Sequence, residues 1–362
     1  MLGGRKYSAM PSTPHPRYAD YDPDGPGLDN GNFLGLPRVE RPRVRFTAVP
    51  FDATVSFGEG TAGGPAAVLE ASRQLDVCLE GLDEPWTLGF AWRQLDSPPL
   101  RRNRDLRAIA TDIIAALERG DALRSSQNAG YAQLEQSGAR IAADLERAVG
   151  EDLDAGCLPV VVGGEHSVAL GAYRACAKTG DFGILQIDAH MDLRPAYEGF
   201  RYSHASVMHN ALEAAQLTRL VQVGIRDYSP VEAARVAREA GRVVTFTDRR
   251  MQRHVLRGGH FAELAERIVA ELPKRVWVSL DVDGLEPALC AHTGTPVPGG
   301  LRYAEAQYLL QTVVASGREI LGMDVVEVAT EPLEASVAAR LAYDFACRAA
   351  LRLRPPGDDG GG

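Results

Sequence analysis

Short apolar runs alternate with helical patterns along most of this 362-residue chain. Stretches with helical periodicity, such as 129–149, 260–272 and 302–316, separate several of the runs. Buried strands that alternate with helices are typical of a doubly wound parallel sheet with helices on both faces. The sequence therefore predicts an α/β fold. Its strands are expected at 44–50, 158–164, 182–188, 220–225, 242–247, 275–281 and 319–328.

The chain is expected to form a single folded unit over residues 41–355, because no linker interrupts the alternating pattern there. The first 40 residues are rich in Pro, Gly, Asp and Tyr and have no clear periodicity, so we expect a partly ordered N-terminal extension. The last residues, 356–362, consist of Pro, Gly and Asp, a composition that predicts a disordered tail.

Composition excludes some classes of function. Lys and Arg total 39 against 48 Asp and Glu, a net charge of −9, whereas a nucleic-acid-binding surface would need a basic stripe. The acidic balance suits a cationic small-molecule substrate. No apolar run is long enough to span a membrane, and the first residues lack the apolar core of a signal peptide. Five scattered cysteines are expected to be free thiols, so we expect a cytoplasmic protein.

The stretch "FGILQIDAHMDLRP" (182–195) changes from apolar to polar halfway. Side chains of an extended segment alternate between two faces, so Asp188, His190 and Asp192 should point the same way at the carboxyl end of a strand. Anions this close repel each other unless a positive charge lies between them. The stretch therefore predicts a divalent metal ion.

Two other predicted strands end in the same kind of residue. "VVVGGEHS" places His166 directly after one strand, and "RVWVSLDVDG" places Asp281 and Asp283 after another. Each motif alone is also compatible with a turn or a helix cap, but together they predict a metal centre. Carboxylates and imidazoles without thiolates favour Mn²⁺, or another hard to borderline ion, over structural zinc. Six ligands fit two ions about 3.5–4 Å apart better than one.

Several motifs resemble those of the ureohydrolase (arginase/agmatinase) family over roughly residues 44–352. They are "GGEHS", "DAHMDLRPAYEG…SHASVM", "SLDVDGLEP…TGTPVPGGL", "PFDATVSFGEGTAGGPAAVLEAS" (50–72) and "DVVEV" (324–328). The resemblance implies a three-layer α/β/α arginase-like fold, a centre with two Mn²⁺ ions and hydrolysis of a guanidino group to urea. It also implies a homotrimer or homohexamer.

The resemblance also implies a role for each site residue. One ion would be held by His166, Asp188, Asp192 and Asp281, and the other by His190, Asp188, Asp281 and Asp283. Asp188 and Asp281 would bridge the two ions. His204, in "YSHAS", aligns with the family's proton-shuttling histidine, and Glu327 aligns with its guanidinium-binding carboxylate. A histidine in a surface loop and a carboxylate at the rim of a strand end are the alternative interpretations of these last two residues.

The substrate is harder to predict. Arginases hold the α-carboxylate with an SGNxHG-like stretch, and the corresponding "LRPAYEGFRYSHAS" lacks it and resembles the agmatinase branch. Hydrolysis of agmatine to putrescine and urea is therefore expected. The alternatives are guanidinobutyrate, guanidine, arginine or formiminoglutamate as substrate. A non-catalytic assembly subunit is also possible in principle, but such a subunit should lack a metal ligand or His204.

Two segments depart from the family pattern. "ALCAHTGTP" (288–296) contains Cys290, Ala291 and His292 where small residues and proline are usual. "EVATEP" (327–332) contains Thr330 and Glu331 where proline-containing sequences are usual. Both segments are expected to flank the pocket, so they bear on the substrate. For agmatine, the pocket mouth should carry acidic or carbonyl groups and no arginine aimed at a carboxylate.

Overall fold

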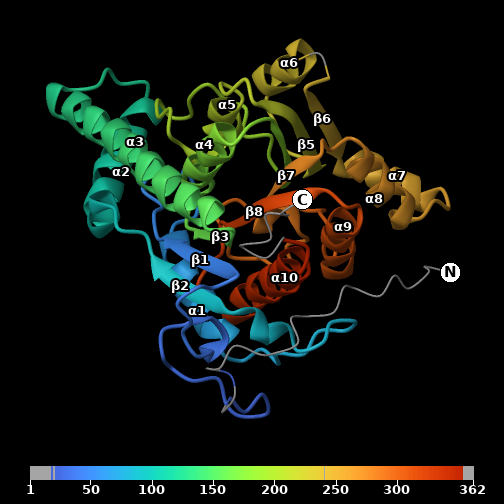
Figure 1. Cartoon of the computed structure of the whole chain (residues 1–362). Helices are drawn as coiled ribbons and strands as arrows, with labels where there is room; N and C mark the ends of the chain where they lie inside the picture. The colour runs from blue at the N-terminus through green and yellow to red at the C-terminus, as the bar shows by residue number, and fades with distance from the viewer. Residues whose placement is uncertain (1–17, 19–20, 240, 354–362) are drawn as a thin grey trace.

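A computed structural model describes Tyr18, residues 21–239 and residues 241–353. Residues 1–17 of the predicted extension and the predicted tail at 356–362 lie outside this part of the chain. The described residues form one sheet of eight strands in the order β2-β1-β3-β8-β7-β4-β5-β6, with every neighbouring pair parallel (Figure 1). The strands are β1 Val44–Val49, β2 Phe90–Gln94, β3 Leu158–Gly163, β4 Phe182–Ile187, β5 Leu217–Ile225, β6 Val243–Thr247, β7 Arg275–Asp281 and β8 Glu319–Val326.

Helices cover both faces of the sheet, so the predicted three-layer fold is confirmed (Figure 1). One face carries α1 Gly64–Ser72, α7 Asp248–Leu256, α8 Phe261–Ala270, α9 Tyr303–Ala315 and α10 Pro332–Ala350. The other carries α2 Asn103–Glu118, α3 Ser125–Asp154, α4 Leu170–Lys178, α5 Val207–Ala211 and α6 Pro230–Arg238. Side chains along β3 alternate between the two cores, since Val160 and Val162 join the first and Val161 joins the second.

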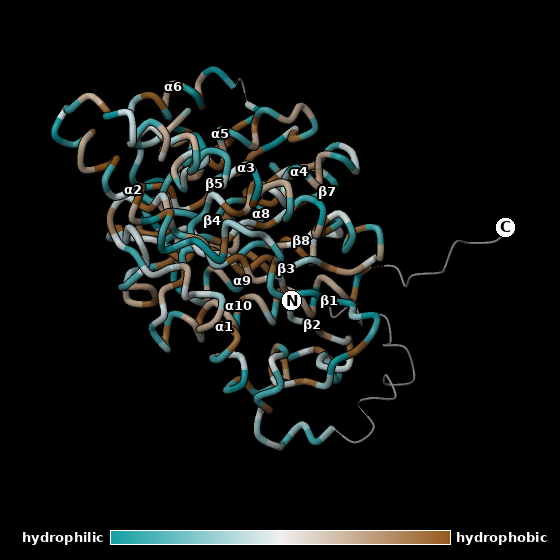
Figure 2. Tube along the Cα trace, turned by 90° about the vertical axis from the view of Figure 1, so that its left-hand side faces the viewer, coloured by the Kyte–Doolittle hydropathy of each residue, from teal (hydrophilic) through white to brown (hydrophobic). Residues whose placement is uncertain are grey.

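Hydrophobic segments, drawn in brown, gather among the strands at the centre of the molecule (Figure 2). None of the helices in the described part of the chain combines the length and hydropathy needed to cross a membrane.

Strand β2, at the edge of the sheet, was not predicted. It has only five residues, three of which are half-buried, so it lacks the apolar run that marks the other strands. The described part of the predicted extension covers this edge. Asn32 accepts a hydrogen bond from the Trp92 backbone and donates one to the Phe90 carbonyl, and the Phe33 ring stacks on Phe46 at 3.9 Å. This packing protects an otherwise open strand edge. The division at residue 41 stays a prediction.

The parallel arrangement decides where the site lies. Strands β3, β8, β7, β4 and β5 are consecutive neighbours, so the residues that follow them all meet at one edge of the sheet. The ends of β3, β4 and β7 carry every predicted metal ligand, and the end of β8 carries Glu327.

Candidate active site

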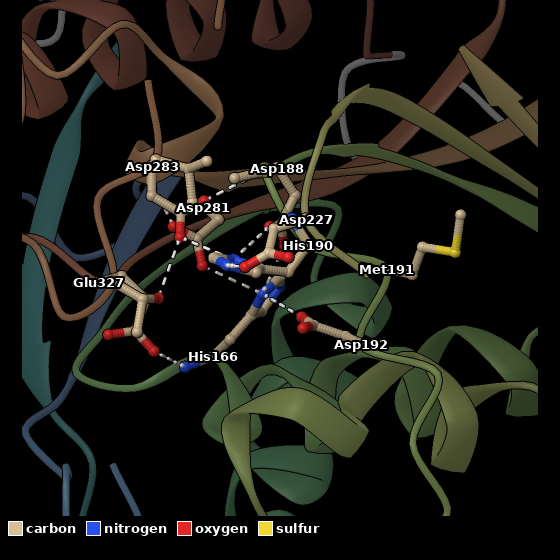
Figure 3. A network of polar contacts seen from close by, with 12 residues as sticks. His166, Asp188, His190, Met191, Asp192, Asp227, Asp281, Asp283 and Glu327 are labelled. Atoms are coloured by element: carbon tan, nitrogen blue, oxygen red, sulfur yellow. Dashed lines mark hydrogen bonds and ion pairs between the residues drawn. The ribbon is translucent and has the colours of Figure 1, made fainter. Parts of the chain in front are cut away.

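The structure brings the six predicted metal ligands together at the carboxyl edge of the sheet (Figure 3). Asp188, His190 and Asp192 converge on the cluster, whereas the intervening Met191 points away from it. The alternation predicted from "FGILQIDAHMD" is therefore present. The ligands come from the ends of β3 (His166), β4 (Asp188, His190 and Asp192) and β7 (Asp281 and Asp283).

Three carboxylates surround one ring nitrogen of His166. Its Nδ1 lies 2.9 Å from Asp192 Oδ2, 3.2 Å from Asp188 Oδ2 and 3.3 Å from Asp281 Oδ2. The histidine side chain is only 1% exposed, and Nδ1 has no hydrogen-bond partner. A buried ring nitrogen facing three carboxylate oxygens is a donor set that fits a divalent cation.

A second group adjoins the first through Asp188. His190 Nδ1 lies 3.0 Å from Asp283 Oδ2 and 3.6 Å from Asp188 Oδ1. His166, Asp188 and Asp192 can thus hold one ion, and Asp188, His190 and Asp283 another. Asp281 reaches the first group through Oδ2, and its Oδ1 accepts the backbone N–H of Asp283 at 2.9 Å. Two overlapping groups are the arrangement that a binuclear centre requires.

The electrostatics show that this cluster is short of positive charge. Burial and the charge of Asp188 raise the pKa of Asp192 to about 7. Burial, with the charges of Asp283 and Asp188, raises the pKa of Asp281 well above its usual range. Burial opposes protonation of His190, but the charges of Asp283 and Asp188 and the hydrogen bonds to them together outweigh it and raise the pKa of that histidine to about 12. Divalent cations would supply the missing charge, so the residues present fit a metal centre.

A second layer of polar groups, which the sequence did not reveal, orients His166. Its Nε2 lies 2.9 Å from Ser279 Oγ, which donates to Asp324 Oδ1 at 2.8 Å. The Tyr173 hydroxyl and the Trp277 indole N–H both donate to Asp324 Oδ2, at 3.1 and 2.6 Å. These bonds occupy Nε2 and leave Nδ1 for a ligand. A buried aspartate inside the apolar run 319–328 was the available signal.

His204 follows a loop and lines the cavity beside the cluster. Its Nε2 lies 3.5 Å from Ser56 Oγ, and the Tyr197 ring meets it edge-on at 5.8 Å. Nδ1 has no hydrogen-bond partner. Burial and the nearby charge of His190 lower the pKa of His204 to about 4. The imidazole is therefore neutral at pH 7 and can accept a proton.

Glu327 follows β8 in a strained conformation. Its φ is 60°, which non-glycine residues seldom adopt. Oε1 accepts the His166 backbone N–H at 2.9 Å, while Oε2 is buried without a partner. Burial and the charge of Glu165 raise the pKa of Glu327 well above its usual range. The carboxylate thus has one oxygen free and lacks a counter-charge.

A cavity of about 320 Å³ opens over the cluster and is lined by His190, Asp192 and His204. We call the residues Phe57, Arg194, Asp227 and Tyr228, which also line this cavity, the rim. Because Arg194 lies at this rim, the expectation that no arginine there is aimed at a substrate carboxylate depends on what Arg194 contacts.

Two neighbours engage the Arg194 side chain, because its Nε lies 3.6 Å from Glu232 Oε2 and its guanidinium lies 4.7 Å above the Tyr197 ring. The Asp227 side chain is 69% exposed, and its Oδ2 lies 4.0 Å from His190 Nε2. The rim therefore holds an acid that is open to a ligand and an arginine with an internal partner.

Comparison with protein families matches residues 42–351 to the arginase family. The chain belongs to the arginase family. It is 33% identical over 303 residues, covering 80% of this chain and 83% of the relative, to N(1)-aminopropylagmatine ureohydrolase of Thermus thermophilus. It is 38% identical over 206 residues, 53% of this chain and 61% of the relative, to guanidinopropionase of Pseudomonas aeruginosa.

Solved structures share the fold of this arginase-family chain. Proclavaminate amidino hydrolase from Streptomyces clavuligerus superimposes with a TM-score of 0.68 at 23% identity, covering 93% of this chain and all of the other. The resemblance inferred from the motifs and the arginase-like fold are thus confirmed. The chain is an amidinohydrolase of a family that uses a binuclear metal cluster.

Proposed function

We propose that this enzyme cleaves agmatine to putrescine and urea at a centre of two Mn²⁺ ions. Two overlapping ligand groups that share Asp188 and are short of positive charge carry the proposal. His166, Asp188, Asp192 and Asp281 would hold one ion, and His190, Asp188, Asp281 and Asp283 the other. The absence of thiolates from this set favours Mn²⁺ over a structural zinc ion.

The chain's own residues divide the remaining work. Divalent ions held by these residues would supply a strong nucleophile, since metal binding can lower the pKa of water to about 7. Glu327 presents a free Oε2 that can accept an N–H of the guanidinium group and supply its counter-charge. His204 is neutral and lies at the cavity, so it can take a proton from the reacting centre and return it to the departing amine.

The rim supports a substrate whose far end is cationic. Glu232 neutralises Arg194, whereas Asp227 is exposed and can accept a hydrogen bond from an ammonium group. Agmatine has an ammonium group at that end. N(1)-aminopropylagmatine is a second candidate, because a relative with that activity in its name covers most of this chain and because Phe57, 81% exposed, leaves the rim open to a longer substrate.

A substrate panel tests this proposal. Urea release by the Mn²⁺-loaded enzyme should be measured with agmatine, N(1)-aminopropylagmatine, arginine, 4-guanidinobutyrate and guanidine. We expect the better of the two cationic substrates to exceed the others in kcat/KM by at least about tenfold, the value of one charge-assisted hydrogen bond. A lead for guanidinobutyrate or guanidine would refute the cationic-end proposal and leave the hydrolysis of guanidino groups standing.

We also propose that the enzyme is a cytoplasmic homotrimer or homohexamer. Five free cysteines, four of them buried, support a reducing compartment. Light scattering coupled to size-exclusion chromatography should give a mass of three or six chains, and a monomer would contradict the proposal.

A further inference from the structure

The segment 288–296, one of the two that depart from the family pattern, is hydrogen-bonded to the start of α10. A single oxygen of Glu334, Oε1, accepts the His292 backbone N–H at 2.7 Å and faces His292 Nδ1 at 3.0 Å. The Glu334 side chain is 3% exposed, and its other oxygen has no partner. His292 is 63% exposed, so apolar burial does not hold it in place. The carboxylate is therefore the contact that fixes this residue.

The fastened segment leads directly to Glu327. Thr293 Oγ1 donates to the Glu327 carbonyl at 2.7 Å. The next residue, Gly294, accepts the Gly58 backbone N–H at 3.0 Å, and a side chain there would come within 3.2 Å of Glu327 Oε2. Residues 293–294 thus pack against both the main chain and the free side-chain oxygen of Glu327.

Glu327 needs such support because its φ of 60° is unfavourable for a residue with a side chain. Three bonds hold it, from its N–H to the Gly164 carbonyl at 2.8 Å, from His166 N–H to Oε1, and from Thr293 to its carbonyl. The first two come from the metal-bearing strand end. The third depends on the segment that His292 anchors.

We infer that His292 and Glu334 form a positioning pair that holds Glu327 in its strained conformation and thereby sets the affinity of the enzyme for the guanidinium group. This inference rests on the proposed role of Glu327. His292 lies in the segment 288–296, where the resemblance to the family leads us to expect small residues and proline. The pair touches neither the metal ligands nor the rim.

The test uses the metal-loaded full chain and two readouts. Calorimetry gives the dissociation constant of guanidinium ion, which reports on Glu327 without turnover, and steady-state urea release gives KM and kcat. In Glu334→Ala we expect the guanidinium dissociation constant and KM to rise about 5- to 20-fold, part of the value of a charge-assisted hydrogen bond. The metal content should be unchanged, and kcat should change less than KM.

Three further variants separate positioning from general destabilisation. In His292→Ala the guanidinium dissociation constant should rise less than in Glu334→Ala, because the backbone N–H of residue 292 still donates to Glu334. In His292→Asn the affinity should equal that of the wild type, because the amide N–H of asparagine lies close to the position of Nδ1. Glu305→Ala is the matched control, since Glu305 is also a buried acid in the first turn of a helix, α9, where it accepts the Arg302 backbone N–H. It should lower the melting temperature without changing guanidinium affinity.

Unchanged guanidinium affinity in Glu334→Ala would overturn the inference. Equal losses of guanidinium affinity in His292→Asn and His292→Ala would also overturn it. A loss of affinity in Glu305→Ala that matches the loss in Glu334→Ala would also overturn it. If the wild-type protein neither binds guanidinium nor releases urea, the proposed function itself is wrong. If the wild type does both and the variants behave like it, only the role of the pair fails.

Discussion

The cluster of six metal ligands, which we call the floor, reaches the cavity through His190 and Asp192. It differs from the rim in how tightly the fold fixes it. His166 is 1% exposed and its ring is held by Ser279, whereas Phe57 is 81% and Tyr228 45% exposed. The floor lies at strand ends whose register is set by the sheet, and the rim lies in connecting loops. We therefore expect the floor to determine the reaction and the rim to determine which guanidino compound enters.

Changes to the floor should have the largest effect. Asp188→Ala or Asp281→Ala should lose metal and activity on every substrate, because each carboxylate is proposed to bridge two cations. Metal content per chain and urea release would be measured together, with Asp227→Ala as a rim control that keeps its metals. If either floor variant still bound two ions at wild-type affinity, the bridging assignment would be wrong.

His204 lies between the floor and the rim. His204→Ala should keep both metals and slow turnover about 10²- to 10⁴-fold, the usual contribution of a positioned acid or base. Metal analysis alongside kcat on two substrates of different length would check this. Loss of metal would show that His204 is a metal ligand and belongs to the floor. A fall in kcat on only one of the two substrates would show that it acts as part of the rim.

Changes to the rim should alter substrate preference only. Asp227→Asn should lower kcat/KM for agmatine about tenfold, as expected for one charge-assisted hydrogen bond, and leave guanidine turnover unchanged because guanidine has no far end. Because Asp227 lies 4.0 Å from His190, a proposed metal ligand, guanidine turnover and metal content should be measured as well, to show that the substitution leaves the metal centre intact. Equal losses on both substrates would show that Asp227 supports the floor instead.

The smallest effect concerns stability against pH. The pKa of His204 is lowered to about 4 in the folded protein, so between pH 6.5 and 4 the unfolded chain binds more protons. The unfolding free energy of metal-free protein should thus fall as pH drops through this range. His204→Gln should reduce that fall by about 1–3 kcal/mol, measured by urea unfolding. An identical pH dependence in the variant would contradict burial of a neutral imidazole.

The same contrast explains how far the sequence could be interpreted. Apolar runs predicted seven strands, and alternation after Ile187 predicted a convergent cluster, because both depend only on neighbouring residues. The contact between Ser279 and Asp324 depends on β7 lying beside β8 with these two residues in register, and strand order is not written in local sequence. The presence of Arg194 at the rim could not be predicted, because loop geometry depends on packing between distant segments.

Metal titration tests the central claim of a two-ion hydrolytic centre most directly. Metal-free protein should be titrated with Mn²⁺ while bound metal and urea release from agmatine and N(1)-aminopropylagmatine are followed in the same samples. We predict that two ions bind per chain and that urea release is negligible without metal and reaches its maximum as the second ion binds. Binding of a single ion per chain, or full activity in metal-free protein, would contradict the claim.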